Sequence, residues 1–134
     1  MVENGSKLNS STPRPVVVGL VGERLAGKDT VANYLVEKYG ALHLKYSTVM
    51  DEVLDVLDLP RSRRNEMDVS VAMRKTFHDN VWWDAIKKKA STATAPIVVI
   101  NGNRFPDEFK LAQEFGARMI YITAPMDTLY ERFV

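Results

Sequence analysis

The stretch from Gly22 to Lys28, Gly-Glu-Arg-Leu-Ala-Gly-Lys, has the residue types and spacing needed to hold a phosphate group. Gly22 and Gly27 permit backbone torsions that a Cβ atom would block, so the N–H groups of the loop can turn inward around an anion. Lys28 adds a positive charge, and a helix beginning here would add the positive end of its dipole. The pattern predicts a P-loop that binds the triphosphate end of a nucleotide, with ATP as the expected ligand. The residues expected to contact it are Gly22, Glu23, Arg24, Leu25, Ala26, Gly27, Lys28, Asp29 and Thr30.

Asp29 follows the lysine, at the position where Ser or Thr usually offers a hydroxyl to Mg²⁺. A carboxylate is also a hard oxygen ligand, so Asp29 is a candidate metal ligand. The alternative role for Asp29 is a negative charge that complements the amino terminus of the helix. Thr30 keeps a hydroxyl in the first helical turn, where it can contact the α-phosphate or cap the helix.

A second polar loop begins at Asn101, directly after an apolar run that predicts a strand. In many P-loop proteins a carboxylate at this position holds Mg²⁺ through water. Here the residue is an amide, so we expect Asp29 and Asn101 together to form the metal site. Arg104 is expected to point into the phosphate cleft, where its planar fork suits a pair of phosphate oxygens. The alternative is a surface ion pair of Arg104 with Asp107 or Glu108, acids that otherwise fit the first turn of a helix.

Apolar runs alternate with amphipathic stretches along the chain, which predicts strands alternating with helices. Runs without internal alternation are typical of strands buried on both faces of a parallel sheet. We therefore expect an α/β fold of three layers, a P-loop NTPase fold with four parallel strands, whose ligand site lies at the carboxyl ends of the strands. The predicted strands are 16–21, 41–46, 97–100 and 119–122. The predicted helices are 29–39, one capped by Ser47 or Thr48 and ended by Pro60, two between 61 and 90, 106–115 and 125–133.

The amino-acid composition of the chain is that of an ordinary globular protein. Of its 134 residues, 46% are hydrophobic and 26% are charged. The net charge of +1 favours neither nucleic acid nor a membrane surface as partner. There is no cysteine, and residues 1–15 lack the apolar core of a signal peptide, which favours the cytoplasm. We expect residues 1–15 to form a flexible tail and 16–134 to form one domain.

The sequence Gly-x-x-x-x-Gly-Lys-Asp-Thr-Val-Ala and the later Asn-Gly-x-Arg turn resemble the nucleoside monophosphate kinase-like P-loop family. The dephospho-CoA kinase and deoxynucleoside monophosphate kinase branches are the most similar, and the resemblance runs from Val16 to Val134. It implies a kinase that moves the γ-phosphoryl group of ATP to a small phosphate acceptor, with Mg²⁺ as cofactor. Lys28 and Arg104 would then be the catalytic residues. Ser47, Arg64 and Arg74 would bind the acceptor, with Arg63 as a further candidate.

The resemblance also implies an arginine-rich lid, a fifth strand and a final helix after the position of Val134. From this we expect the chain as given to bind ATP but to transfer phosphate slowly. Two alternatives stay open, a nucleotide-binding module without turnover and a kinase of a phosphorylated metabolite that is not a nucleotide. His43 and His78 have no second ligand at metal-site spacing, so structural roles are expected for both. Solvated helix faces remain the alternative for the arginines.

Overall fold

The computed structural model describes residues 15–23, 25–102 and 106–133. Its centre is a sheet of four parallel strands in the order β2-β3-β1-β4. The strands are β1 (Val16–Gly22), β2 (Leu42–Lys45), β3 (Ile97–Asn101) and β4 (Arg118–Ile122). The predicted α/β fold with a parallel sheet is therefore confirmed. The predicted tail lies outside the described residues, apart from Pro15.

Helices make every connection between consecutive strands, as the alternating pattern predicts. They are α2 (Lys28–Tyr39), α3 (Tyr46–Val56), α4 (Arg63–Thr76), α5 (Val81–Ser91) and α6 (Pro106–Glu114), and a further helix, α7 (Met126–Phe133), follows β4. No helix within the described part of the chain is both long and apolar enough to cross a lipid bilayer.

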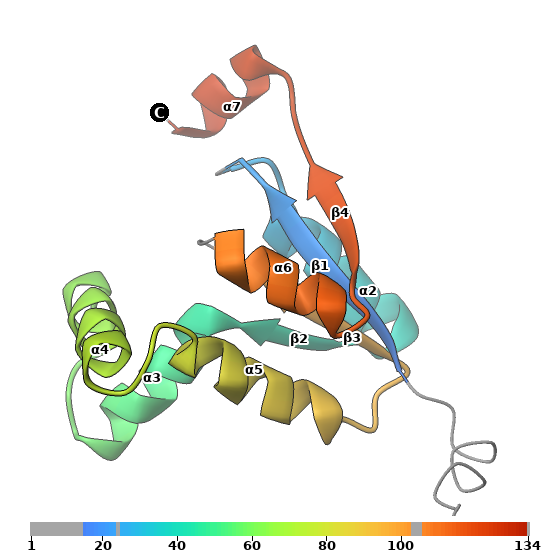
Figure 1. Ribbon diagram of the computed structural model, residues 1–134. Helices are drawn as coiled ribbons and strands as arrows, with labels where there is room; N and C mark the ends of the chain where they lie inside the picture. Colours follow the sequence, from blue (N-terminus) through green and yellow to red (C-terminus); the bar gives the residue numbers. More distant parts are fainter. Residues whose placement is uncertain (1–14, 24, 103–105, 134) are drawn as a thin grey trace, which may run out of the picture.

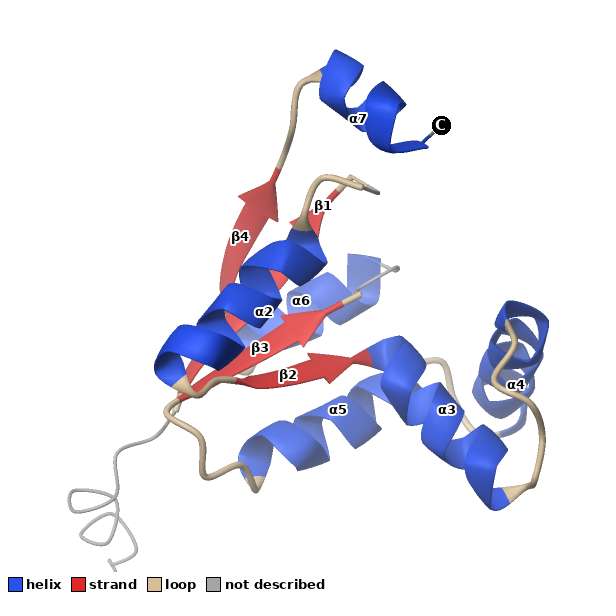
Figure 2. Cartoon of the chain, turned by 180° about the vertical axis from the view of Figure 1, so that it is seen from behind, coloured by secondary structure: helices blue, strands red, loops and turns tan. Residues whose placement is uncertain are grey.

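Helices cover both faces of the sheet, which gives the three layers. Figure 1 shows α5 and α6 in front of the strands, and the reverse view in Figure 2 brings α2 to the front. Successive residues of β3 point to opposite faces of the sheet and pack against different helices. Val98 and Ile100 pack in the same core as α5 and α6, whereas Val99 packs with Ala32 of α2. All three valine and isoleucine side chains are fully buried, which explains the unbroken apolar run of this strand.

The strand order places a crevice between β1 and β3. From β1 the chain crosses through α2 toward β2, on one side of this strand pair. From β3 it crosses through α6 to β4, on the opposite side. Connections that leave two neighbouring strands in opposite directions open a gap at their carboxyl ends, where ligands bind in open α/β sheets. The P-loop and the loop after Asn101 both begin at this gap.

One local expectation for the middle of the chain is wrong. Helix α3 begins at Tyr46, directly from β2 with Lys45 as its N-cap, so neither Ser47 nor Thr48 caps it, and it ends at Val56 rather than near Pro60. The two helices expected between residues 61 and 90 are present as α4 and α5. In α4 the buried residue is Val69, whereas Met67 and Val71 are 51% and 63% exposed, because this helix packs mainly on α3 and α5.

Candidate active site

The P-loop residues adopt the backbone shape that their sequence predicts. Gly22 has a φ of 146° and Gly27 a φ of 109°, both in the region that disfavours a Cβ atom. At Gly22 the restriction is also steric, since an added Cβ would lie 2.1 Å from the carbonyl oxygen of Ile122. Leu25 adopts a positive φ of 69° as well. The loop therefore turns sharply between β1 and α2, as a nest of backbone N–H groups requires.

The amino terminus of α2 faces this loop with its first backbone N–H groups available. Gly27 is the N-cap, and no side chain among the described residues caps the helix through a hydrogen bond. Lys28 lies beside the loop, where its Nζ donates to the carbonyl oxygen of Gly22 at 2.8 Å and to that of Glu23 at 3.3 Å. A helix amino terminus and an ammonium group next to it favour a bound anion.

Glu23 ties the loop to β4, the edge strand that pairs with β1. The hydroxyl of Tyr121, on β4, donates to Glu23 Oε1 at 3.1 Å, and Thr123 Oγ1 donates to the same oxygen at 3.5 Å. The hydrogen bond to this carboxylate raises the pKa of Tyr121 above its ordinary value. Glu23 thus anchors the loop from outside, and its side chain faces β4.

Asp29 sits in a polar network that joins three elements. Asn101, at the end of β3, donates from Nδ2 to Asp29 Oδ1 at 2.9 Å. Lys45, at the end of β2, forms an ion pair with Asp29 Oδ2 at 3.2 Å. The predicted pair of Asp29 and Asn101 does meet, but Asn101 presents its amide nitrogen, which is no metal ligand. In this arrangement Asn101 orients the carboxylate.

His43 completes the network from the middle of β2. Its Nε2 lies 3.2 Å from Asn101 Nδ2. Because the amide nitrogen can only donate, His43 Nε2 accepts and the imidazole carries its proton on Nδ1. Burial lowers the pKa of His43, partly offset by the charge of Asp29, and Lys45 lowers it further. The histidine is therefore held neutral beside the loop. It belongs to the polar network of the site, whereas the sequence analysis expected only a structural role for it.

Two connected hollows open at the carboxyl ends of β1, β2 and β3. The main cleft has a volume of about 680 Å³ and is lined by Gly27 to Thr30, Lys45, Ser47, Arg63 and Asn101, among others. The side cavity has a volume of about 130 Å³ and is lined by Tyr46, Met50, Met67, Val71, Trp82 and Glu108, among others. The two hollows share the walls Tyr46, Met50, Arg63, Glu66 and Gly102.

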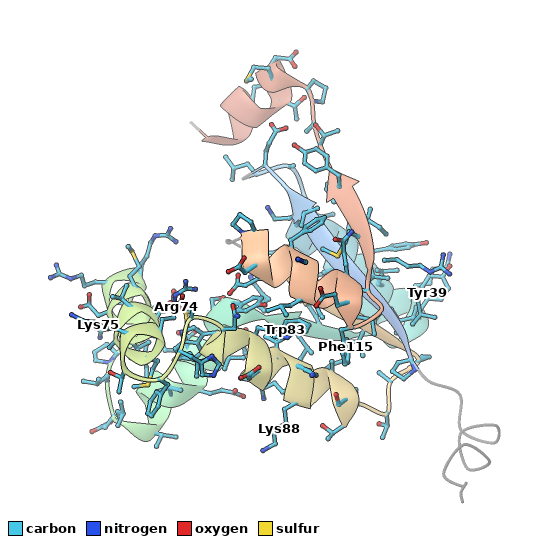
Figure 3. All side chains as sticks on the ribbon, in the orientation of Figure 1. Tyr39, Arg74, Lys75, Trp83, Lys88 and Phe115 are labelled. Carbon is cyan, nitrogen blue, oxygen red and sulfur yellow. The ribbon has the colours of Figure 1, made fainter. Side chains whose placement is uncertain are left out.

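Only some of the residues that the sequence analysis expected to bind the acceptor line the two hollows. Ser47 lines the main cleft. Arg64 does not, because its side chain is 86% exposed and pairs with Asp68 one helical turn away. Its neighbour Arg63, the further candidate, lines both hollows and is therefore better placed than Arg64 to reach a ligand there. Arg74 is half-buried and lies on the side of α4 that faces the rest of the molecule, as Figure 3 shows, but it is not among the residues that line either hollow.

Several site residues were missed from the sequence. Lys45 looked like an ordinary strand residue, although the rule that ligands bind at the carboxyl ends of strands applies to it as well. Glu108 does lie in the first turn of α6, but it is only 3% exposed, which no helix-start pattern predicts. Tyr46 is also 3% exposed. Arg24 and Arg104, both expected at the phosphates, lie outside the described residues.

The residues at the mouth of the P-loop fit a magnesium ion of the kind that nucleotides bring with them. No group of three or more His, Cys, Asp or Glu side chains in the described part of the chain could hold a metal ion alone. Mg²⁺ in nucleotide sites takes one or two carboxylates and completes its shell with phosphates and water. Asp29, with its side chain 61% exposed toward the cleft mouth, supplies one such carboxylate.

Comparisons with known proteins do not identify a function for this chain. No protein-family model matches the sequence, and no curated protein is significantly similar to it. Among solved structures, the crystal structure of TT1252 from Thermus thermophilus is similar, with a TM-score of 0.48 and 18% sequence identity. That similarity covers 89% of this chain and 71% of the other.

Proposed function

We propose that this protein is an ATP-dependent kinase that transfers the γ-phosphoryl group of ATP to a small, nucleotide-like phosphorylated acceptor. One observation carries the proposal, namely that a P-loop with an uncapped helix amino terminus opens into a cleft that continues into a second, mostly apolar cavity. A protein that only held a nucleotide would need the first feature alone. A phosphotransferase needs both, because its two substrates must meet end to end.

The chain offers a cationic group at each point where negative charge would gather. The loop amides and Lys28 suit the β- and γ-phosphates of ATP. Arg63, at the junction of the two hollows, suits the phosphate of the acceptor as a planar fork. Lys45 also lines the main cleft. In the reaction an acceptor oxygen bonds to the γ-phosphorus, and the bond to the β,γ-bridging oxygen breaks, so its electron pair leaves with ADP.

Asp29 would hold the Mg²⁺ that accompanies the nucleotide, and this ion would neutralise charge on the β- and γ-oxygens. Asn101 fixes the carboxylate at the end of β3, and Lys45 balances its charge. Without such restraints the carboxylate could rotate away, because its side chain is largely exposed. No protein group needs to act as a strong base in this type of transfer.

A coupled assay of ADP release tests the proposal. ATP and Mg²⁺ would be combined with the protein and with each member of a panel of nucleoside monophosphates, dephospho-CoA and isopentenyl phosphate. We expect ADP release that depends on one class of acceptor and that Lys28→Ala removes. The matched control is Lys38→Ala, at the exposed end of the same helix. ATP binding without acceptor-dependent release would favour a module without turnover.

A further inference from the structure

Both oxygens of the Asp29 carboxylate have partners within the chain. Oδ1 accepts from Asn101 Nδ2 at 2.9 Å, and Oδ2 pairs with Lys45 Nζ at 3.2 Å. Lys45 and Asn101 are register partners at the ends of β2 and β3, so their side chains leave the same face of the sheet. A divalent cation that Asp29 coordinates therefore has to take the place of one of these two donors.

The two partners of Asp29 differ in how firmly they are held. Asn101 is 3% exposed, and His43 Nε2 holds its amide nitrogen from a second side at 3.2 Å. The Lys45 side chain is 36% exposed, and its ammonium group ends a flexible stem of four carbons. An exposed ion pair of this kind is weak, because water and salt screen it. Lys45 is therefore the partner that can leave Oδ2, while Asn101 keeps its hold on Oδ1.

An ammonium group that leaves Asp29 remains in the main cleft. Lys45 lines this cleft together with Lys28 and Thr30, which begin the helix behind the P-loop. Lys28 has a similar arrangement, since its Nζ donates to the carbonyl oxygens of Gly22 and Glu23. Phosphate oxygens form strong charge-assisted hydrogen bonds with ammonium groups, so both lysines can exchange protein oxygens for those of a nucleotide.

We propose that Lys45 is a second phosphate-binding lysine, which serves as the counterion of Asp29 until it yields Oδ2 to a divalent cation and then donates to a phosphate oxygen. This inference rests on the proposed function, since it adds a substrate contact and a source of metal dependence to that same site. The exchange leaves one cation on the carboxylate throughout. Asp29 therefore never meets the phosphates as an uncompensated negative charge, which would repel them.

Calorimetric titration with the β,γ-methylene analogue of ATP, with and without Mg²⁺, tests the exchange. The variant is Lys45→Met, which removes the ammonium group and keeps an apolar stem. Lys45 caps α3 without a side-chain hydrogen bond, so the start of this helix is unaffected. With Mg²⁺ the affinity for the analogue should fall about tenfold, the effect of one lost hydrogen bond to a charged group. Without Mg²⁺ it should fall about fiftyfold, because Asp29 then also repels the phosphates.

The gain in affinity that Mg²⁺ causes should therefore be about fivefold larger in Lys45→Met than in the wild type. A cycle through Asp29 separates this exchange from the general effect of removing a charge. In the Asp29→Asn background, Lys45→Met should leave the Mg²⁺ gain unchanged, because the lysine and the cation no longer share a partner. Lys88→Met, on the exposed face of α5 (Figure 3), is the matched control and should bind like the wild type under both conditions.

The possible outcomes keep this inference apart from the proposed function. If the wild type binds the analogue but Lys45→Met has an unchanged Mg²⁺ gain, or an unchanged affinity with Mg²⁺, the exchange is overturned and the kinase proposal stands. A Mg²⁺ gain that rises as much in the Asp29→Asn background would show a bulk effect of charge and would also overturn the exchange. No binding by the wild type under either condition overturns both proposals. Lys45→Gln is the second variant, and the same results are expected of it.

Discussion

Replacing Asn101 by aspartate reverses the interaction that orients Asp29. In the wild type, Asn101 Nδ2 donates to Asp29 Oδ1 at 2.9 Å. Asn101→Asp removes this donor and places a second carboxylate at the same distance. A hydrogen bond to a charged group contributes about 1.5 kcal/mol at the lower end of its range, which applies because the Asp29 side chain is 61% exposed. Repulsion between two unit charges at this separation adds at least about 1.4 kcal/mol, the value in bulk water, because Asn101 is buried.

The expected loss of at least about 3 kcal/mol is measurable by thermal unfolding. For a chain of this length the melting temperature changes by about 3.5 °C per kcal/mol, so Asn101→Asp should melt at least about 10 °C below the wild type at about pH 8 without divalent ions. The penalty should shrink as the pH falls through the range of histidine. The new carboxylate raises the pKa of His43, and a protonated His43 then pairs with it, so this stabilisation is present at low pH and lost as the pH rises.

Magnesium should restore the variant, because two facing carboxylates attract a divalent cation. We expect Mg²⁺ at about 10 mM to raise the melting temperature of Asn101→Asp by several degrees and that of the wild type by far less. Asn101→Leu is the control, since it loses the same hydrogen bond without adding a charge and should respond neither to Mg²⁺ nor to acid. A variant as stable as the wild type, or an equal response to Mg²⁺ in both, would refute the described network.

Three further predictions concern the loop and the acceptor. Lys28→Ala should abolish ATP binding in calorimetry while the circular dichroism spectrum of the folded chain is kept, because the hydrogen bonds of the lysine go to loop carbonyls and not to the core; equal ATP affinities would contradict a P-loop. Gly22→Ala should lower the stability by about 3 kcal/mol or prevent folding, since its Cβ would meet the oxygen of Ile122, and a normal urea midpoint would argue against this loop geometry. Arg63→Gln should weaken acceptor binding about tenfold and Arg64→Gln should not, and the reverse order would restore the sequence-based assignment.

The sequence predicts the architecture because its signals are local. An unbroken apolar run such as Val98 to Ile100 has one physical solution, a strand covered on both faces. Glycines at fixed spacing before a helix likewise specify a particular backbone turn, and Gly22 and Gly27 adopt it. The pairing of Asp29 with Asn101 followed from a topological rule, since Asp29 follows the loop after β1 and Asn101 ends the adjacent strand β3.

The acceptor side could not be predicted because it depends on tertiary packing. Helix α4 packs on other helices, so its periodicity does not tell which of its faces is buried. The sequence therefore could not show that Arg63 lines the cleft and that Arg64 faces solvent. A carboxylate in the first turn of a helix is ordinarily solvated, so the burial of Glu108 leaves no trace in the sequence. The same holds for Tyr46, whose unpaired hydroxyl is defined only by what surrounds it.

Mapping the fate of the γ-phosphoryl group tests the central claim most directly. The protein would be incubated with Mg²⁺, an acceptor that binds, and ATP labelled at the γ-phosphate, and the labelled products would be separated. The proposed kinase predicts labelled acceptor in equal molar amount to the ADP formed, with neither product appearing in Lys28→Ala. Label found only in inorganic phosphate, or retained in ATP that is bound but never consumed, would contradict the assignment of this protein as a kinase.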